Sequence, residues 1–233
     1  MGSLSGLKVS CLLMLSLLLN SSSGLLLSPN RKIKLGKFPP TCTRIECPSY
    51  DVIFNGKAYE IRRYNYTVWM STSTIDDISF VSATRTGFLK LFDYIQGKNK
   101  DEKKIEMTAP VITQVIPSDG PFCKSSFVVS FYVPKFYQPN PPPAHGLHAQ
   151  KWEPVYTAVR QFDGFVSDDD TGKEAAALYA SLAGSRWADA IDKTSSSDPT
   201  SSYIVAQYNS PFEYDSRVNE IWMTFNMQDE LLM

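Results

Sequence analysis

Alternating hydrophobic and polar positions are most regular in residues 103–115, the longest strand-like run outside the N-terminal hydrophobic segment (KKIEMTAPVITQV). This alternation predicts a strand with one packed face and one solvated face. Pro110 has no backbone N–H to donate, so we expect a bend, a bulge or a sheet edge near it. A helical pattern at 78–96 precedes the run, and a strand at 126–133 follows it after a turn at 117–120.

The order strand, helix, strand, strand recurs in the second half of the chain. A helix is expected at 171–191, with a capping-box pattern at Thr171 and Glu174 and a break near Gly184. The segment IRRY at 61–64 is echoed 98 residues later by VRQF at 159–162. Further strands are expected at 51–54, 59–64, 66–72, 155–166, 203–208 and 218–225. The pattern therefore predicts an α+β domain of two related βαββ halves around a barrel-like core.

Two connecting segments complete this outline. Residues 135–148 are rich in proline and are expected to be the connector between the halves, while 194–202 is expected to be a loop. Asn55-Gly56 is a turn dipeptide between two strand-like runs, which predicts a hairpin there.

Residues 1–24 have the organisation of a secretory signal peptide. Lys8 precedes an apolar run at 9–19, and small residues follow it. The run is shorter than the ~20 residues of a membrane span, although the leucines at 25–27 keep an uncleaved membrane anchor open as an alternative. We expect a secreted protein, or one delivered to the vacuole, with no stable membrane span after cleavage. The mature chain would have an extension at 25–49, a domain at 50–226 and a tail at 227–233.

Export changes the expected role of cysteine. Cys11 would leave with the leader, so Cys42, Cys47 and Cys123 remain. A local disulfide between Cys42 and Cys47 is the preferred pairing in an oxidising compartment, and a pairing of Cys123 with either of them stays open. Asn65 begins the sequence Asn-Tyr-Thr, which makes it a candidate N-glycosylation site.

Charge and histidine content exclude several function classes. The net charge is −1 and no basic stripe is present, so no nucleic-acid partner is expected. The two histidines, His145 and His148, stand in the proline-rich segment without an evident Ser, Cys or Asp partner. We therefore expect no catalytic triad, no resident metal site and no enzymatic activity.

Eight segments together resemble the SOUL haem-binding protein family in its plant form. They are YEIRRY (59–64), VWMST (68–72), TGFLKLFDYIQGKN (86–99), KKIEMTAPVI (103–112), FYVP (131–134), VRQFDGF (159–165), YNSPF (208–212) and NEIW (219–222). The resemblance implies a distorted antiparallel β-barrel of two pseudo-symmetric four-stranded arrays, with helices packed outside. It also implies reversible binding of haem or another tetrapyrrole.

From this resemblance we expect a monomeric, non-catalytic carrier or buffer of tetrapyrroles. The alternatives are a protein-interaction module that uses the same fold and a sensor of small hydrophobic ligands. An enzyme that acts on a tetrapyrrole or its ester ranks below them, and turnover of a porphyrin by the pure protein would be needed to support it. Binding of a tetrapyrrole by the purified domain discriminates between the first alternative and the carrier.

The candidate ligand face lies on the predicted helix at 78–96. A helical wheel places Val81, Arg85, Phe88, Phe92 and Ile95 on one face, with Phe80 and Leu91 at its margins. Candidate haem contacts are therefore Arg85, Phe88, Leu91 and Phe92. Arg85 has two interpretations: it reaches the rim or pairs with a carboxylate such as Glu106, or it pairs with a propionate of the ligand.

The resemblance implies a ligand contact at some positions of this chain, while at others the chain lacks the residue that the family has. It places a haem-contacting arginine at Arg85 and hydrophobic contacts at Phe88 and Phe92. Asp93 and Glu213 stand where the family has two lysines near the propionates. Arg63 stands where one branch has a proposed histidine ligand, so we expect no strong protein axial ligand for iron.

Overall fold

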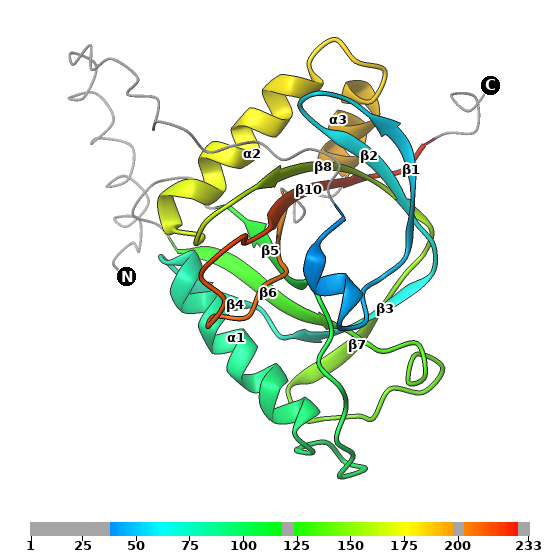
Figure 1. Cartoon of the computed structure of the whole chain (residues 1–233), viewed down its shortest axis with the longest axis vertical. Coiled ribbons are helices and arrows are strands. Elements are labelled where there is room, and N and C mark those ends of the chain that lie inside the picture. Colours follow the sequence, from blue (N-terminus) through cyan, green and yellow to red (C-terminus); the bar gives the residue numbers. More distant parts are fainter. Residues whose placement is uncertain (1–37, 118–123, 198–202, 228–233) are drawn as a thin grey trace, which may run out of the picture.

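The structure, a computed structural model, describes residues 38–117, 124–197 and 203–227. In these ranges an antiparallel sheet curls into a half-barrel, and the helices pack on its outer face (Figure 1). Its elements are η1 (Pro40–Thr43), β1 (Tyr50–Asn55), β2 (Glu60–Tyr64), β3 (Thr67–Thr72), β4 (Ile75–Asp77), α1 (Phe80–Ile95), β5 (Val111–Ile116), β6 (Ser125–Tyr132), β7 (Leu147–Trp152), β8 (Val155–Phe162), α2 (Asp168–Leu182), α3 (Ala188–Ser197), β9 (Tyr203–Gln207) and β10 (Asn219–Phe225). The expected signal peptide at 1–24 and Cys123 lie outside the described residues.

The strand order confirms the expected barrel of two arrays. The order is β1-β2-β8-β10-β9-β5-β6-β3-β7, with β4 paired to β6. The pairing of β5 with β9 joins one array, β7-β3-β6-β5, to the other, β9-β10-β8-β2. Each array takes its outermost strand from the other half of the chain, because β7 pairs with β3 and β2 pairs with β8.

This topology corrects the predicted alignment of the two halves. The equivalent units are β3-α1-β5-β6 and β8-α2-α3-β9-β10, so β3 and β8 correspond. The similar segments 61–64 and 159–162 instead lie on β2 and β8, which are neighbours, with Ile61 opposite Ala158. The duplication was therefore predicted correctly. The two similar segments, however, lie on strands that pair with each other, not on strands that occupy equivalent positions in the two halves.

The prediction of a strand at 103–115 is wrong for residues 103–110. Only β5 is a strand, and it begins at Val111, directly after a cis peptide bond between Ala109 and Pro110. Residues 103–110 approach the rest of the fold without joining the sheet: Ile105 N donates to Ile95 O at 2.8 Å, and Ala109 N donates to Glu46 O at 3.0 Å. The proline expected to disturb the strand instead precedes it.

Three other element bounds differ from the prediction. The helix predicted to begin near Thr171 begins at Asp168, because Asp170 accepts the Ser167 N–H at 3.2 Å and so caps an earlier turn. Helix α3 extends to Ser197, into the predicted loop. Strand β7 was predicted partly as connector; it is an edge strand with mostly exposed side chains, so its sequence has no hydrophobic alternation. The hairpin at Asn55-Gly56 is confirmed by the antiparallel pairing of β1 with β2.

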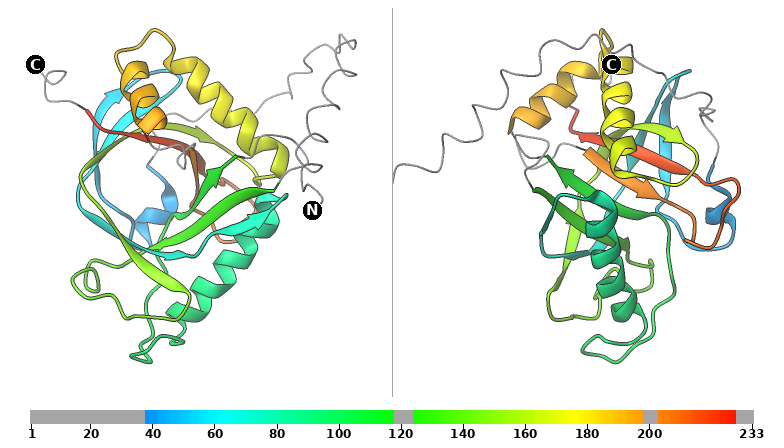
Figure 2. Two further views of the ribbon diagram at one scale, coloured as in Figure 1. Left: turned by 180° about the vertical axis from the view of Figure 1, so that it is seen from behind. Right: turned by 90° about the vertical axis from the view of Figure 1, so that its left-hand side faces the viewer.

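The core has three parts, two outside the sheet and one inside its curl. One outer cluster lies under α1, and the other lies mainly under α2 and α3. The inner cluster is centred on Trp69 and Trp222, and Cys42, Ile45 and Cys47 pack against it from the η1 segment. In Figures 1 and 2, η1 covers one open end of the curl. No helix in the described ranges is long and apolar enough to cross a membrane.

Candidate ligand-binding site

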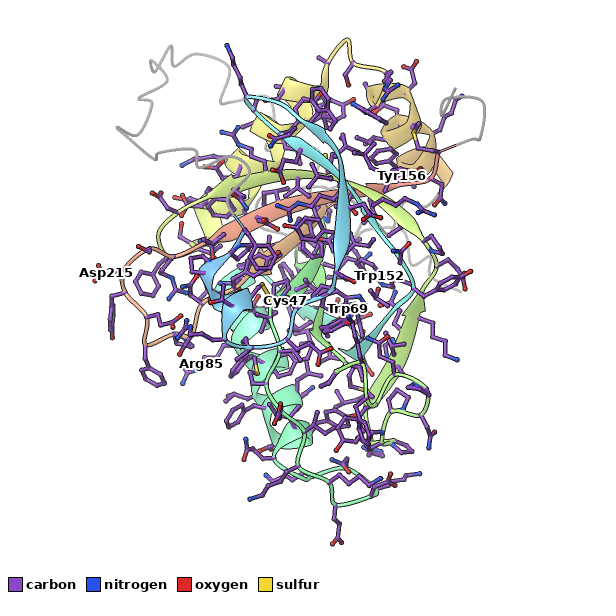
Figure 3. The ribbon with its side chains drawn as sticks, turned by 45° about the vertical axis from the view of Figure 1, so that its right-hand side comes forward. Cys47, Trp69, Arg85, Trp152, Tyr156 and Asp215 are labelled. Carbon is purple, nitrogen blue, oxygen red and sulfur yellow. A yellow bond between two sulfur atoms is a disulfide. The ribbon has the colours of Figure 1, made fainter. Side chains whose placement is uncertain are left out.

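A groove runs between α1 and the loop that connects β9 to β10, residues 208–218. It consists of two adjoining hollows of about 500 and 510 Å³, both within the size range of small-molecule sites. Residues that line both hollows include Phe88, Leu89, Val111, Asn209, Pro211 and Phe212. Figure 3 shows Arg85 of α1 and Asp215 of the loop at the same edge of the molecule, while Cys47 and Trp69 lie towards its centre.

Helix α1 is fixed at both its N-terminus and its packed face. The Asp77 carboxylate accepts the Ser79 N–H at 3.0 Å, and Asp168 of α2 accepts the Val81 N–H at 3.0 Å. These acceptors satisfy N–H groups that a helix start leaves free. At Gly87 an added Cβ would lie 2.3 Å from Val129 Cγ2, so only glycine allows α1 to lie this close to β6.

This close packing decides which helix residues reach the groove. Leu91 is 0% exposed, belongs to the core under α1 and lines neither hollow. Leu89, which the sequence did not single out, lines both. Arg85 lines one hollow, Phe92 lines the other, and Phe88 lines both. Of the four expected contacts, three lie along the groove and one is part of the core.

Aromatic rings form an apolar wall on the helix side. The Phe88 and Phe92 rings stack with centroids 5.8 Å apart and planes 16° apart. Phe88 is held from behind by Phe131, whose ring centroid is 5.4 Å away. Phe92 remains 40% exposed, and Phe212 on the loop is 83% exposed. A flat apolar molecule would remove this aromatic surface from water, which is the favourable contribution such a wall can make.

The Arg85 guanidinium is available to an anionic group. Its side chain is exposed, and within residues 38–117, 124–197 and 203–227 no group forms a hydrogen bond or an ion pair with it. Pairing with Glu106, one of the two interpretations from sequence, is therefore absent from the described residues. A guanidinium fork matches the geometry of a carboxylate.

Glu213, expected to repel a propionate, is already held by three donors. Its carboxylate accepts from Arg44 Nη2 at 2.6 Å, from Asn209 Nδ2 at 3.1 Å and from the Ser210 N–H at 3.2 Å. The hydrogen bond from Arg44 is the main reason that the pKa of Glu213 lies below its usual value. Arg44 thus offsets the negative charge on this side of the groove.

The interior of the half-barrel is filled by a buried ion network. Arg62 donates to Glu220 at 2.9 and 3.0 Å and to Glu60 at 2.9 Å. Glu220 also accepts from three neutral donors: Gln161 at 2.7 Å, Tyr208 at 2.8 Å and Trp222 at 2.6 Å. These groups satisfy one another, as buried charges require. The two hollows of the groove, about 500 and 510 Å³, are each about twice as large as the hollow of about 240 Å³ that Gln114, Trp152 and Ile204 line on the inner side of the curl, so the groove offers more room for a ligand.

The groove offers little for strong ligation of iron. His148 lies on the edge strand β7 opposite Ser71, and neither it nor the exposed His145 lines either hollow. Tyr208 lines one hollow, but burial raises its pKa well above the usual value and its hydroxyl donates to Glu220. Met107 contributes a thioether to the lining. Across the described ranges no group of three or more His, Cys, Asp or Glu could hold a metal ion.

Sequence reasoning missed the second wall of the groove. It is formed by Thr41, which directly precedes Cys42, and by Arg44 and Ile45 of the loop that the Cys42–Cys47 disulfide closes. The structure confirms this cysteine pairing. The remaining wall is the loop at 209–213, together with Arg217. The turn residues Asn209-Ser210-Pro211 marked a loop, and the same segment carried part of the family resemblance. Neither signal showed that the loop faces α1, because that proximity depends on the pairing of β5 with β9.

The chain is similar in sequence to proteins of one family. The sequence model of the family described as SOUL heme-binding protein matches residues 45–224. Heme-binding protein 2 of Mus musculus is 34% identical over 185 residues, covering 77% of this chain and 85% of its own. Heme-binding protein 2 of Homo sapiens is 37% identical over 170 residues, covering 71% and 77%.

Among solved structures, EcmrR in its complex with DNA has a TM-score of 0.50 at 9% identity, covering 72% of this chain and 57% of its own. At this level of identity the likeness concerns the fold alone. The extent of the family match and the identity to curated relatives lead to one conclusion: the chain belongs to the SOUL heme-binding protein family.

Proposed function

We propose that the protein binds haem or another tetrapyrrole reversibly in the groove and acts as a non-catalytic carrier or buffer. The observation that carries the proposal is the stacked Phe88–Phe92 wall beside Arg85, which pairs with no described residue, in a chain similar in sequence to proteins named heme-binding. A flat apolar ring with carboxylate groups fits both features.

The aromatic residues of the groove would bury the ring of the ligand, and Arg85 would orient its carboxylate. Contact with Phe88, Phe92 and Phe212 removes apolar surface from water, a gain of about 25 cal/mol per Å². Arg85 stands at the exposed rim, where water screens its attraction for a carboxylate, so it orients more than it tightens. When bound, the tetrapyrrole supplies its own redox or light-absorbing chemistry. Release remains easy because the histidines lie elsewhere.

The test compares haem with an uncharged porphyrin ester. Arg85→Ala should weaken haem binding about two- to fivefold, the range of an exposed ion pair, and leave the ester unchanged. Phe88→Ala should weaken both ligands, because it removes ring contact common to the two. Absorbance titration of haem and fluorescence titration of the ester measure both constants.

Phe136→Ala is the matched control for the aromatic variant. Phe136 is 84% exposed and lines neither hollow, so its removal should leave both affinities unchanged. Circular dichroism establishes that each variant is folded. A folded Phe88→Ala protein that binds both ligands like the wild type would place the site elsewhere.

We also infer that the chain is exported as a monomer after loss of residues 1–24. The leader-like sequence at the N-terminus and the disulfide-bonded pair Cys42 and Cys47 support export. The exposure of Asn65 in the turn between β2 and β3 supports its use as a glycosylation site. The final destination is secretion, with the vacuole or an anchored form as the alternatives.

A further inference from the structure

Arg217 is a buried cation that forms no ion pair with a carboxylate of the described residues. Its exposed fraction is 6%, close to that of Arg62 at 0%. Arg62 is paired with Glu60 and Glu220, whereas no carboxylate in the described part of the chain forms an ion pair with Arg217. A buried charge without an opposite charge is costly, so this arrangement suggests a partner that comes from outside the chain.

The guanidinium of Arg217 is held in place by one of its nitrogens. Nη1 donates to the backbone carbonyls of Ser210 at 2.8 Å and Glu213 at 2.6 Å. The group also lies 4.2 Å from the centroid of the Phe165 ring. These contacts fix the side chain at the base of the β9–β10 loop without using the opposite edge of the guanidinium.

That opposite edge is the part left for a ligand. Nε is buried and has no hydrogen-bond partner among the described residues, and no bond from Nη2 is present there either. Nε and Nη2 form the fork through which arginine binds a carboxylate with two parallel hydrogen bonds. Arg217 lines the hollow of about 510 Å³ that Arg85 and Phe88 also line.

The neighbouring acidic residues do not occupy this edge. The Glu213 carboxylate is bound by Arg44, and Glu213 contacts Arg217 only through its backbone carbonyl. The charge of Glu213 acts on Arg217 from farther away, where burial remains the larger influence and lowers the pKa of Arg217. Arginine nevertheless stays protonated at neutral pH.

We propose that Arg217 is the inner carboxylate-binding site of the groove, where its Nε–Nη2 edge binds one carboxylate of a flat apolar acid. Resting on the proposed function, that group is a propionate of the tetrapyrrole. Arg217 then carries most of the preference for a free acid over an ester, because it is buried whereas Arg85 is exposed and screened by water.

The test uses metal-free protoporphyrin IX and its dimethyl ester, so that iron ligation plays no part. Arg217→Lys keeps a positive charge and a donor for the loop carbonyls but lacks the planar fork. It should weaken binding of the acid about tenfold or more, as expected for a desolvated charge-assisted contact, and change binding of the ester less than twofold. Arg85→Lys is the matched control at an exposed arginine and should change the acid-to-ester ratio less than Arg217→Lys does.

Folding of the variant is followed separately. Circular dichroism and thermal unfolding show whether Arg217→Lys retains the loop. Should the variant fail to fold, the wild-type Nε–H resonance of Arg217 gives a second measurement. Its exchange with water should slow more when protoporphyrin IX is added than when the ester is added, because only the acid offers a carboxylate to this N–H; equal slowing by the two probes would overturn the proposal.

The outcomes separate this site from the proposed function. A wild-type protein that binds both probes, with an acid-to-ester ratio that Arg217→Lys leaves unchanged, overturns the Arg217 site while groove binding stands. A wild-type protein that binds neither probe overturns both proposals. Loss of acid binding alone in Arg217→Lys supports the site.

Discussion

The two buried arginines, Arg62 and Arg217, have different surroundings and therefore different roles. Arg62 faces two carboxylates inside the half-barrel, and the Tyr50 ring lies 4.2 Å from its guanidinium. Burial of these charges costs free energy that their mutual attraction and hydrogen bonds offset. Among the described residues, Arg217 donates hydrogen bonds only to backbone carbonyls, and its guanidinium lies over the Phe165 ring. The same residue type therefore completes the fold in one place and leaves a binding edge in the other.

The network around Glu220 predicts a pH dependence of stability. Burial raises the pKa of Glu220, but Arg62 and the neutral donors lower it more, so the pKa lies below the usual value. A carboxyl with a depressed folded-state pKa stabilises the fold above its unfolded pKa of about 4.3, and this stabilisation is lost as pH falls through the folded value.

Glu220→Gln should therefore cost about 3 kcal/mol of unfolding free energy at pH 7, because Arg62 loses one of its buried partners. The difference from wild type should stay constant down to about pH 5 and shrink at lower pH, because the carboxyl of the unfolded wild-type chain takes up a proton before the folded one does. Urea denaturation at several pH values measures it. A difference that grows with acidification would contradict the assigned sign.

Sequence alone could show which residues share a face of the helix, but not which of them pack against the sheet and which face the groove. Arg85, Phe88 and Phe92 were found because helical spacing groups them. Leu91 was assigned to the same face because a wheel does not show which part of a broad apolar stripe packs. The small residues Ala83 and Gly87 mark the packed side, since they allow close approach to the sheet. Arg217 gave no sequence signal because its burial arises from the fold of the loop.

At the scale of elements, the groove depends on the distance between α1 and the sheet. Gly87 sets this distance, because its missing side chain is where Val129 lies. Phe88 follows it directly in the helix and contacts Phe131 of β6. A shift of α1 outward would therefore move the aromatic wall together with the packed face.

Gly87→Ala should destabilise the protein by about 1–3 kcal/mol, the usual cost of overpacking a core, despite the better helix propensity of alanine. It should also weaken tetrapyrrole binding. Gly172→Ala in α2 is the matched control: nothing lies within 4 Å of its added Cβ, so stability should rise by about 0.5–1 kcal/mol. Denaturant unfolding compares the two variants; equal effects would show that α1 has room to adjust.

The elements that sequence reasoning found are those with strong local signals. Helix α1 and strands β6, β8, β9 and β10 were predicted within a few residues. Residues 103–110 were assigned to a strand because they alternate, yet the N–H groups of Ile105 and Ala109 donate to Ile95 and Glu46 and not to a neighbouring strand. Strand β7 was missed because its sequence does not alternate. It is a strand only because it pairs with β3 at the edge of the sheet, and a local pattern cannot show that pairing.

At the scale of the whole molecule, the two halves form one sheet and exchange strands. Strand β2 completes the array of the second half, and β7 completes the array of the first. The duplicated order of elements could be predicted from sequence, whereas this exchange could not, because it involves pairing between distant segments. Neither half has all its strands without the other.

Export of the whole chain predicts three changes in mass. Protein purified from its native source should lack residues 1–24, carry two hydrogens fewer for the Cys42–Cys47 disulfide and bear a glycan at Asn65. Intact-mass analysis with and without a reductant and a glycosidase measures all three. A full-length, reduced and unglycosylated chain in the cytosol would refute export.

The buried ion network also constrains when the protein can fold during its synthesis. Arg62 and Glu220 are separated by 158 residues, and translation at about 5–20 residues per second spans that distance in roughly 8 to 30 seconds. Strand β2 gains its neighbour β8 only after residue 162 has been made, and until Glu220 follows, Arg62 has only one of its two carboxylate partners, Glu60. The network can therefore be completed only after β10 has been made, so on the proposed export route an unfinished chain would meet the translocation channel before its sheet has closed.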